Sequence, residues 1–129
     1  MRTFINGLVL FLAAGALVIA HHGLAAFDQT TKVTLNGTVT AFRFVNPHAV
    51  VEFDVKDDKG QVQGWQAELT TPNRLKGWTA TSLEPGVVVT VTGYRAKSGA
   101  PSLWVTALTA SNGLELKVFS EASPRPPGD

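Results

Sequence analysis

The chain has 129 residues, of which 44% are hydrophobic and 16% are charged, and this length holds one small domain and no second one. It contains no cysteine, which excludes a disulfide framework and a thiolate metal site. Eleven Lys and Arg stand against ten Asp and Glu, so loss of Arg2 with a leader leaves ten of each. Because nucleic-acid binders gather basic residues to neutralise phosphates, this balance predicts no nucleic-acid partner.

Residues 1–20 have the features of a secretory signal peptide. Arg2 gives a basic start, and an apolar run from Leu8 to Ala20 follows. The run is shorter than the ~20 apolar residues of a membrane-spanning helix, which favours a cleaved leader over a retained anchor. Cleavage after Ala20 makes His21 the first residue, whereas cleavage after Ala26 removes it. The sequence therefore predicts a periplasmic or secreted bacterial protein, with a Sec-type leader and no stable membrane insertion after its removal.

The remaining chain divides into an N-terminal arm (21–32), a β-rich domain (33–119) and a disordered proline-rich tail (120–129). Alternation of apolar and polar residues predicts a long first strand from Val33, and its phase changes near Ala41, as at a β-bulge. The same pattern predicts further strands over 49–55, 62–70, 87–94 and 103–110, and a short segment at 114–119. Between the third and fourth strands, Thr71 and Pro72 open a predicted short helix that ends before residue 84.

The order of these elements predicts the fold. Three strands, a short helix and two strands, with a long bent first strand, is the order of an OB-fold. A β-sandwich is the alternative, but it usually needs about seven strands. We therefore predict an all-β domain with one short helix, an OB-fold-like five-stranded Greek-key barrel.

Several short motifs follow one another along the chain after the leader. They are His21-His22, Gly37-Thr38-Val39, Asn46-Pro47-His48, Gly77-Trp78, Pro85-Gly86 and Tyr94-Arg95-Ala96-Lys97-Ser98-Gly99. Together they resemble a family of small exported bacterial proteins catalogued as a domain of unknown function. The resemblance runs from about His21 to Ala110, and it implies export and a small β-rich fold without implying an activity.

The three histidines of the chain suggest a metal site. If cleavage falls after Ala20, the α-amino group and the ring of His21 can chelate one ion, and the imidazole of His22 or His48 can complete the set. Nitrogen donors of this kind suit Cu(II), as in the histidine brace of secreted copper proteins, which is an analogy at the level of the site alone. Zinc would need a fourth ligand, for which a carboxylate such as Asp28 is available. The alternative is a solvated His-His arm and a His48 held in a turn.

A second hypothesis needs no metal. Trp65, on the predicted third strand, is the aromatic residue best placed for ligand stacking on the face that OB-folds use, and Arg43 and Arg95 flank that face. A small ligand or a periplasmic partner protein would bind there. Glu52, Asp54 and Glu68 lie on neighbouring predicted strands, where solvated sheet residues are the simpler interpretation than a carboxylate pair. We therefore expect a binding or accessory module and no enzyme, with copper-dependent redox chemistry as a distant alternative.

Overall fold

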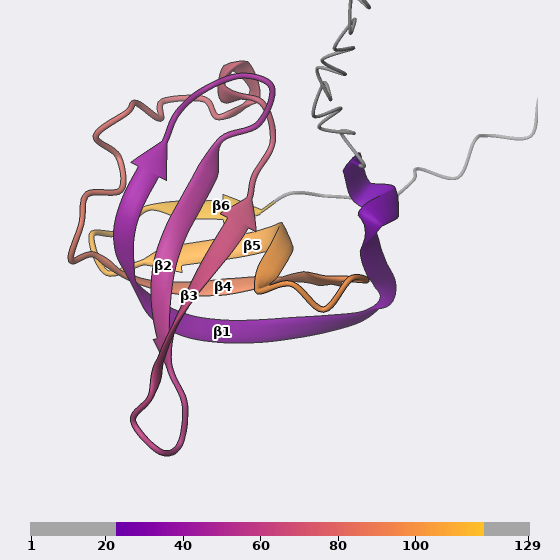
Figure 1. The fold of residues 1–129 in the computed structure, drawn as a ribbon. Helices are drawn as coiled ribbons and strands as arrows, with labels where there is room; N and C mark the ends of the chain where they lie inside the picture. The colour runs from indigo at the N-terminus through magenta and orange to yellow at the C-terminus, as the bar shows by residue number, and fades with distance from the viewer. Residues whose placement is uncertain (1–22, 118–129) are drawn as a thin grey trace, which may run out of the picture.

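The computed structural model describes residues 23–117, which form six strands and two short 3-10 turns (Figure 1). In chain order the strands are β1 (Phe27–Arg43), β2 (Val50–Lys56), β3 (Val62–Glu68), β4 (Val88–Ala96), β5 (Ser102–Ala110) and β6 (Glu115–Lys117). The 3-10 turns are η1 (Gly23–Ala26) and η2 (Pro72–Arg74). The predicted leader (1–20) and tail (120–129) lie outside the described residues, as do the last residues of the predicted segment 114–119.

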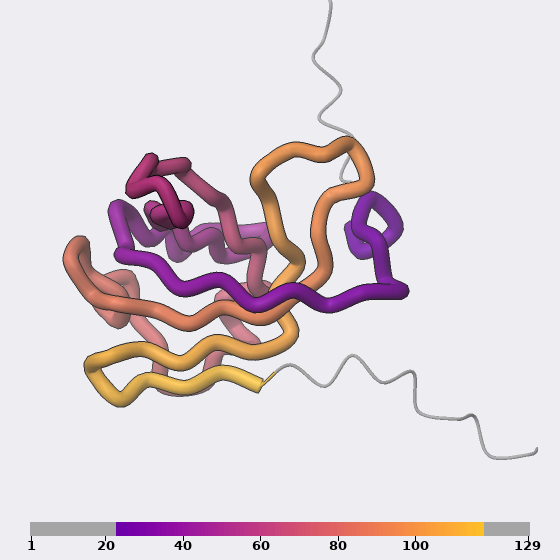
Figure 2. The backbone as a smooth tube through the Cα atoms, turned by 90° about the horizontal axis from the view of Figure 1, so that it is seen from below, coloured from indigo at the N-terminus to yellow at the C-terminus, as the bar shows by residue number. Residues whose placement is uncertain are grey.

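The six strands form one sheet in the order β3-β2-β1-β4-β5-β6, with antiparallel neighbours throughout. A parallel pairing of β3 with β5 joins two strands that are not neighbours in this order. The sheet is thereby closed into a barrel, and β1, β4, β5 and β6 lie as successive runs in Figure 2. This topology is that of the OB-fold, as predicted, with β6 added as a sixth strand.

Strand β1 spans both halves of the barrel. It pairs with β4 from Phe27 to Thr38 and with β2 from Thr38 to Arg43. The register with β2 shifts between Val39 and Ala41, which confirms the predicted bulge. The strand begins at Phe27, inside the segment 21–32 that we predicted as an arm, because strand pairing with β4 and burial of the Phe27 ring extend the sheet beyond the region of strict alternation.

The predicted helix after Thr71 is wrong in type, since residues 23–117 contain only the 3-10 turn η2 at this place. Thr71 makes no side-chain bond to the turn backbone, and Gly77 has a φ of 79°, in the left-handed region that a helix cannot continue through. Leu75 and Trp78 are nevertheless buried, and Trp78 meets the ring of Phe42 edge-on at 6.0 Å. No helix of residues 23–117 is long and apolar enough to cross a bilayer.

The core is built from the inward-facing residues of the strands and of the segment after η2. Its largest fully buried side chains are Phe53, Leu69, Leu83, Leu103 and Leu108. Burial of each such side chain contributes about 1.5–3 kcal/mol. Among the described residues no buried side-chain polar atom lacks a hydrogen-bond partner. The barrel is therefore held by packing and by its backbone ladders, without any disulfide.

Candidate ligand-binding site

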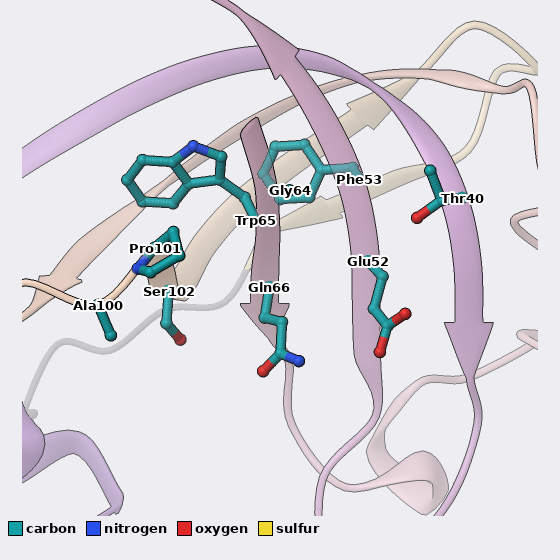
Figure 3. Close-up of a pocket in the computed structure, with 9 residues that line it drawn as sticks. All are labelled: Thr40, Glu52, Phe53, Gly64, Trp65, Gln66, Ala100, Pro101 and Ser102. Carbon is teal, nitrogen blue, oxygen red and sulfur yellow. The ribbon is translucent and has the colours of Figure 1, made fainter. Parts of the chain in front are cut away.

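A pocket of about 470 Å³ opens beside Trp65, on strands β2 and β3 (Figure 3). Its lining residues come from β1, β2, β3 and the start of β5 with its preceding loop: Thr40, Glu52, Phe53, Gly64, Trp65, Gln66, Ala100, Pro101 and Ser102. In OB-folds, the second and third strands and the loop between the fourth and fifth form the usual ligand surface. The pocket, called the β2–β3 pocket below, lies on that surface.

A row of polar side chains crosses the β2–β3 pocket. Glu52 lies opposite Gln66 in the β2–β3 ladder, and Gln66 lies opposite Ser102 in the β3–β5 pairing. Side chains that face each other across an antiparallel pair have Cβ atoms about 4.5–5.5 Å apart. In Figure 3 the polar ends of these three side chains point the same way, and the rings of Phe53 and Trp65 do not share that direction. The row therefore places a carboxylate, an amide and a hydroxyl side by side along the pocket.

Backbone contacts hold the walls of the pocket in place. The N–H of Gln66 donates a hydrogen bond to the carbonyl oxygen of Pro101 at 3.0 Å, which ties the β4–β5 loop to β3. Gly64 leaves the space open, because the nearest atom to a Cβ at this position is Asp54 Oδ1, at 3.8 Å. A larger residue at position 64 would therefore occupy the pocket without a clash against the backbone.

Glu52 is the single charged residue that lines the pocket, and it has a partner. Its Oε1 lies 3.1 Å from Nη2 of Arg43, with the two side chains 34% and 50% exposed. An ion pair at this exposure contributes about 0–1 kcal/mol to stability. The Arg43 guanidinium also offsets the charge of the Glu52 carboxylate, which leaves the pocket close to neutral.

The indole of Trp65 is covered by a second arginine. Arg95 lies over the Trp65 ring, with its Cζ atom 5.2 Å from the ring centroid, and Trp65 is 7% exposed. The ring is therefore a wall of the pocket and not an open stacking platform. Trp65, Arg43 and Arg95, which the sequence singled out together, all gather around this one site, Arg43 through Glu52 and Arg95 through Trp65.

Sequence reasoning missed Gln66, Ser102 and Thr40. The hairpin turn at Asp57–Gly60 carried the signal for Gln66, because the turn position sets the register that brings Gln66 opposite Glu52. Ser102 reaches the site through the parallel β3–β5 closure, and Thr40 lies at the bulge of β1. Neither feature has a sequence signature specific enough to fix which residues meet.

His48 is the one candidate metal ligand of the three histidines that the structure describes, since His21 and His22 lie outside residues 23–117. Its ring is half-buried and meets Trp104 edge-on, with centroids 5.4 Å apart. Trp104 also contacts the ring of Phe27 at 5.7 Å. Within residues 23–117, no three histidine or carboxylate side chains lie close enough together to hold a metal ion.

Asp28, which could have completed a zinc site, forms a local turn with Thr30. Its Oδ1 accepts hydrogen bonds from Thr30 Oγ1 at 2.6 Å and from the Thr30 N–H at 3.0 Å. These bonds, the side-chain one first, lower the pKa of Asp28 below its ordinary value. The exposed carboxylate is therefore ionised at neutral pH and bound to its own strand.

Comparison with known proteins identifies the family. Residues 9–103 match the family of unknown function DUF6152, and the chain belongs to this family. The resemblance to a domain of unknown function is thereby confirmed. No curated protein matches the chain.

Two solved structures are similar to this chain at low sequence identity. The mitochondrial single-stranded DNA binding protein Rim1 of S. cerevisiae is 15% identical, with a TM-score of 0.47, and the match covers 63% of this chain and 93% of Rim1. The N-terminal domain of the PriB protein from Thermoanaerobacter tencongensis, a dimeric structure, is 19% identical, with a TM-score of 0.44. That match covers 61% of this chain and 93% of the PriB domain.

The prediction that nucleic acid is excluded as a partner is wrong, because one of these similar structures is described as a single-stranded DNA binding protein. The exclusion rested on a balanced count of charges over the whole chain. Such a count does not report on local surfaces, and single strands also bind by stacking of bases on aromatic side chains. The net charge of the whole chain therefore does not exclude nucleic acid as a ligand.

Proposed function

We propose that this chain is an exported binding module, without catalysis of its own, that holds a small uncharged polar molecule in the β2–β3 pocket. The observation that carries the proposal is the row Glu52–Gln66–Ser102, which crosses three strands beside a pocket of about 470 Å³. Ligand pockets commonly measure ~300–1,000 Å³ and use a few placed polar groups against an apolar wall. The predicted leader at residues 1–20 supports a location beyond the cytoplasmic membrane.

The lining side chains define the class of ligand. Gln66 and Ser102 can both donate and accept hydrogen bonds, whereas the Glu52 carboxylate accepts them. Because Arg43 offsets the charge of Glu52, a strongly charged molecule gains little from the pocket. A molecule that carries several neighbouring hydroxyl groups, such as a sugar, matches this set of donors and acceptors.

The test is titration of the purified chain with a panel of neutral disaccharides (maltose, sucrose and trehalose), followed by calorimetry. We expect at least one to bind, Gly64→Val to abolish binding by filling the pocket, and Gln66→Ala to weaken it about tenfold, the effect of losing ~1.4 kcal/mol. Gln63→Ala, the same change on the same strand outside the pocket, is the control. Absence of binding at about 10 mM of each disaccharide, which means a Kd above the millimolar range, would overturn the proposal.

A specific contact favours metal binding as a second candidate. Trp104 joins the ring of His48 to the ring of Phe27, and Phe27 directly follows the η1 turn. His21 and His22 precede that turn, so only a few residues of chain, at about 3.3 Å each when extended, separate them from the end of the barrel that holds His48. This supports a Cu(II) site of the His21 amine and ring with His22 and His48.

Intact mass and copper titration of the exported protein test the second candidate. A mature chain that begins at His21 should take up one Cu(II) tightly. His48→Phe should lose that affinity while keeping an aromatic ring against Trp104, so its melting temperature serves as the folding control. A mass that corresponds to a chain beginning at Phe27 would rule the site out. Equal copper affinities of the unaltered chain and of His48→Phe would do the same.

A further inference from the structure

Ladder pairing between β1 and β2 ends at Thr38, although Gly37 still packs against β2, where a Cβ would lie 2.5 Å from the carbonyl oxygen of Asp54. Before Gly37 on β1 and after Asp54 on β2, each strand has an edge without a backbone partner among the described residues. β1 pairs with β2 from Thr38 to Arg43, while its N-terminal part pairs with β4 alone. Val55 and Lys56, at the end of β2, pair with β3 alone. Figure 1 shows the β2–β3 hairpin continuing past β1 at this point. We call the space between the two free edges the β1–β2 cleft.

Two pockets border the β1–β2 cleft, one on each face of the sheet. The outer pocket, of about 400 Å³, is lined by Asn36, Thr38, Asp54, Lys56, Val62 and Val88 with the backbone of Gly37. The inner pocket, of about 480 Å³, has an apolar wall of Leu35, Val55 and Trp65 and a polar rim of Asp57, Gln61 and Gln63. They lie on opposite faces because successive strand residues point to opposite sides, Asn36 and Lys56 outward and Leu35 and Val55 inward.

Two exposed valines mark the cleft further. Val62 borders both pockets and is 54% exposed, and Val88, at the outer pocket, is 51% exposed. Unpaired strand edges are templates for pairing with another chain, and a row of charged residues or a covering loop usually protects them. On the free stretch of β1 from Val33 to Asn36, the side chains carry no charge. This edge is therefore open to an added strand.

We propose that the β1–β2 cleft binds an extended segment of a partner protein, which adds to the free edge of β1 as a strand. In strand addition, main-chain hydrogen bonds hold the segment and pockets accept its alternate side chains. One set of side chains would enter the inner pocket against Leu35, Val55 and Trp65, and the other set would face the outer pocket. This site shares Trp65 with the β2–β3 pocket and does not depend on the function proposed for that pocket.

The charged residues around the cleft define the side chains of the segment that face the outer pocket. The charged residues that line the two pockets are two carboxylates and one lysine: Asp54 and Asp57 against Lys56. The one ion pair within residues 23–117 joins Arg43 to Glu52, so Asp54 forms no ion pair, and it shares the outer pocket with Lys56. The complementary segment is therefore apolar at every second position and basic between them.

The probe is a blocked heptapeptide of alternating lysine and valine, compared with a peptide of the same composition in block order. We expect the alternating peptide to bind the full chain at least about tenfold more tightly, which is the scale of one good added contact. In nitrogen-15 NMR spectra, the amides of Leu35–Gly37 and of Val55 should shift on binding. Methylation of the peptide nitrogens that face β1 should remove the binding.

Val62→Lys and Val45→Lys form a matched pair, because both valines are 54% exposed and Val45 lies in the β1–β2 loop, away from the cleft. Val62→Lys should lower the affinity at least about tenfold, whereas Val45→Lys should leave it unchanged. Equal binding of the alternating and block-ordered peptides would overturn the proposal in favour of unspecific charge attraction. Shifts of the same amides with rising protein concentration and no peptide would overturn it in favour of a second copy of this chain.

Discussion

Gly93→Ala is expected to lower the melting temperature of the chain by more than about 10 °C. A Cβ at position 93 would lie 2.2 Å from the carbonyl oxygen of Trp104 and 2.8 Å from its carbonyl carbon. These are backbone atoms of β5, at the place where the β4–β5 register shifts between Thr92 and Gly93, so no side-chain rotation relieves the clash. Overpacking of this kind costs about 3 kcal/mol, and each kcal/mol moves the melting temperature of a small domain by ~4–8 °C.

Gly64→Ala is the matched control, since Gly64 is also a strand glycine with a negative φ, and its Cβ would meet nothing closer than 3.8 Å. Its melting temperature should stay the same or rise slightly, because alanine reduces the freedom of the unfolded chain. Thermal melts followed by circular dichroism compare the two. Equal melting temperatures would show that the β5 backbone at Trp104 can move away, and that the β4–β5 contact is looser than the structure indicates.

Phe53→Ala is expected to remove about 3–5 kcal/mol of unfolding free energy, the range for a buried phenylalanine. Phe53 is fully buried at 0% exposure and lies opposite Trp65 in the β2–β3 ladder. Its loss would leave a cavity directly behind the β2–β3 pocket, which Phe53 also lines. Because small domains have ~5–15 kcal/mol of stability in total, a large part of it rests on this one ring.

Urea unfolding measures the loss, with Val62→Ala as the control on the neighbouring strand. Val62 is 54% exposed, so its truncation should change the free energy of unfolding by no more than about 0.5 kcal/mol. A loss below about 1 kcal/mol for Phe53→Ala would mean that neighbouring core residues collapse into the space. In that case the wall of the pocket would be adaptable, and ligand affinity would change along with stability.

Alternation predicted most of the fold because five strands bury one face. Val51 and Phe53 point inward on β2, as their spacing predicts, and the change of phase at Ala41 marks the real bulge. The early part of β1 was missed because the residues from Asp28 to Lys32 are all exposed and show no alternation. Their place in the strand follows from the pairing partner, which a local pattern does not contain. The helix prediction was wrong because Gly77 has a left-handed φ of 79°, and this angle depends on how the loop packs.

The residues of the candidate site could likewise be predicted from the sequence only in part. Trp65, Arg43 and Arg95 could be named from residue type and strand position; Trp65 lines the pocket, and each arginine contacts one of its lining residues. Ser102 could not, because it meets Gln66 through the β3–β5 closure between segments far apart in sequence. The burial of Trp65 beneath Arg95 was also out of reach, since it depends on how β4 lies over β3.

The closure between β3 and β5 is short. It consists of three residue pairs, Gln66–Ser102, Ala67–Leu103 and Glu68–Trp104, and the hydrogen bond from Gln66 to Pro101 extends it. Contacts between distant segments form only after their loop has closed, so this seam is expected late in folding and first to open in the native protein. A molecule that bridges Gln66 and Ser102 would clamp the seam shut. Occupancy of the pocket would then slow the opening of the whole barrel, and amide hydrogen exchange along β3 and β5 would report the presence of the ligand.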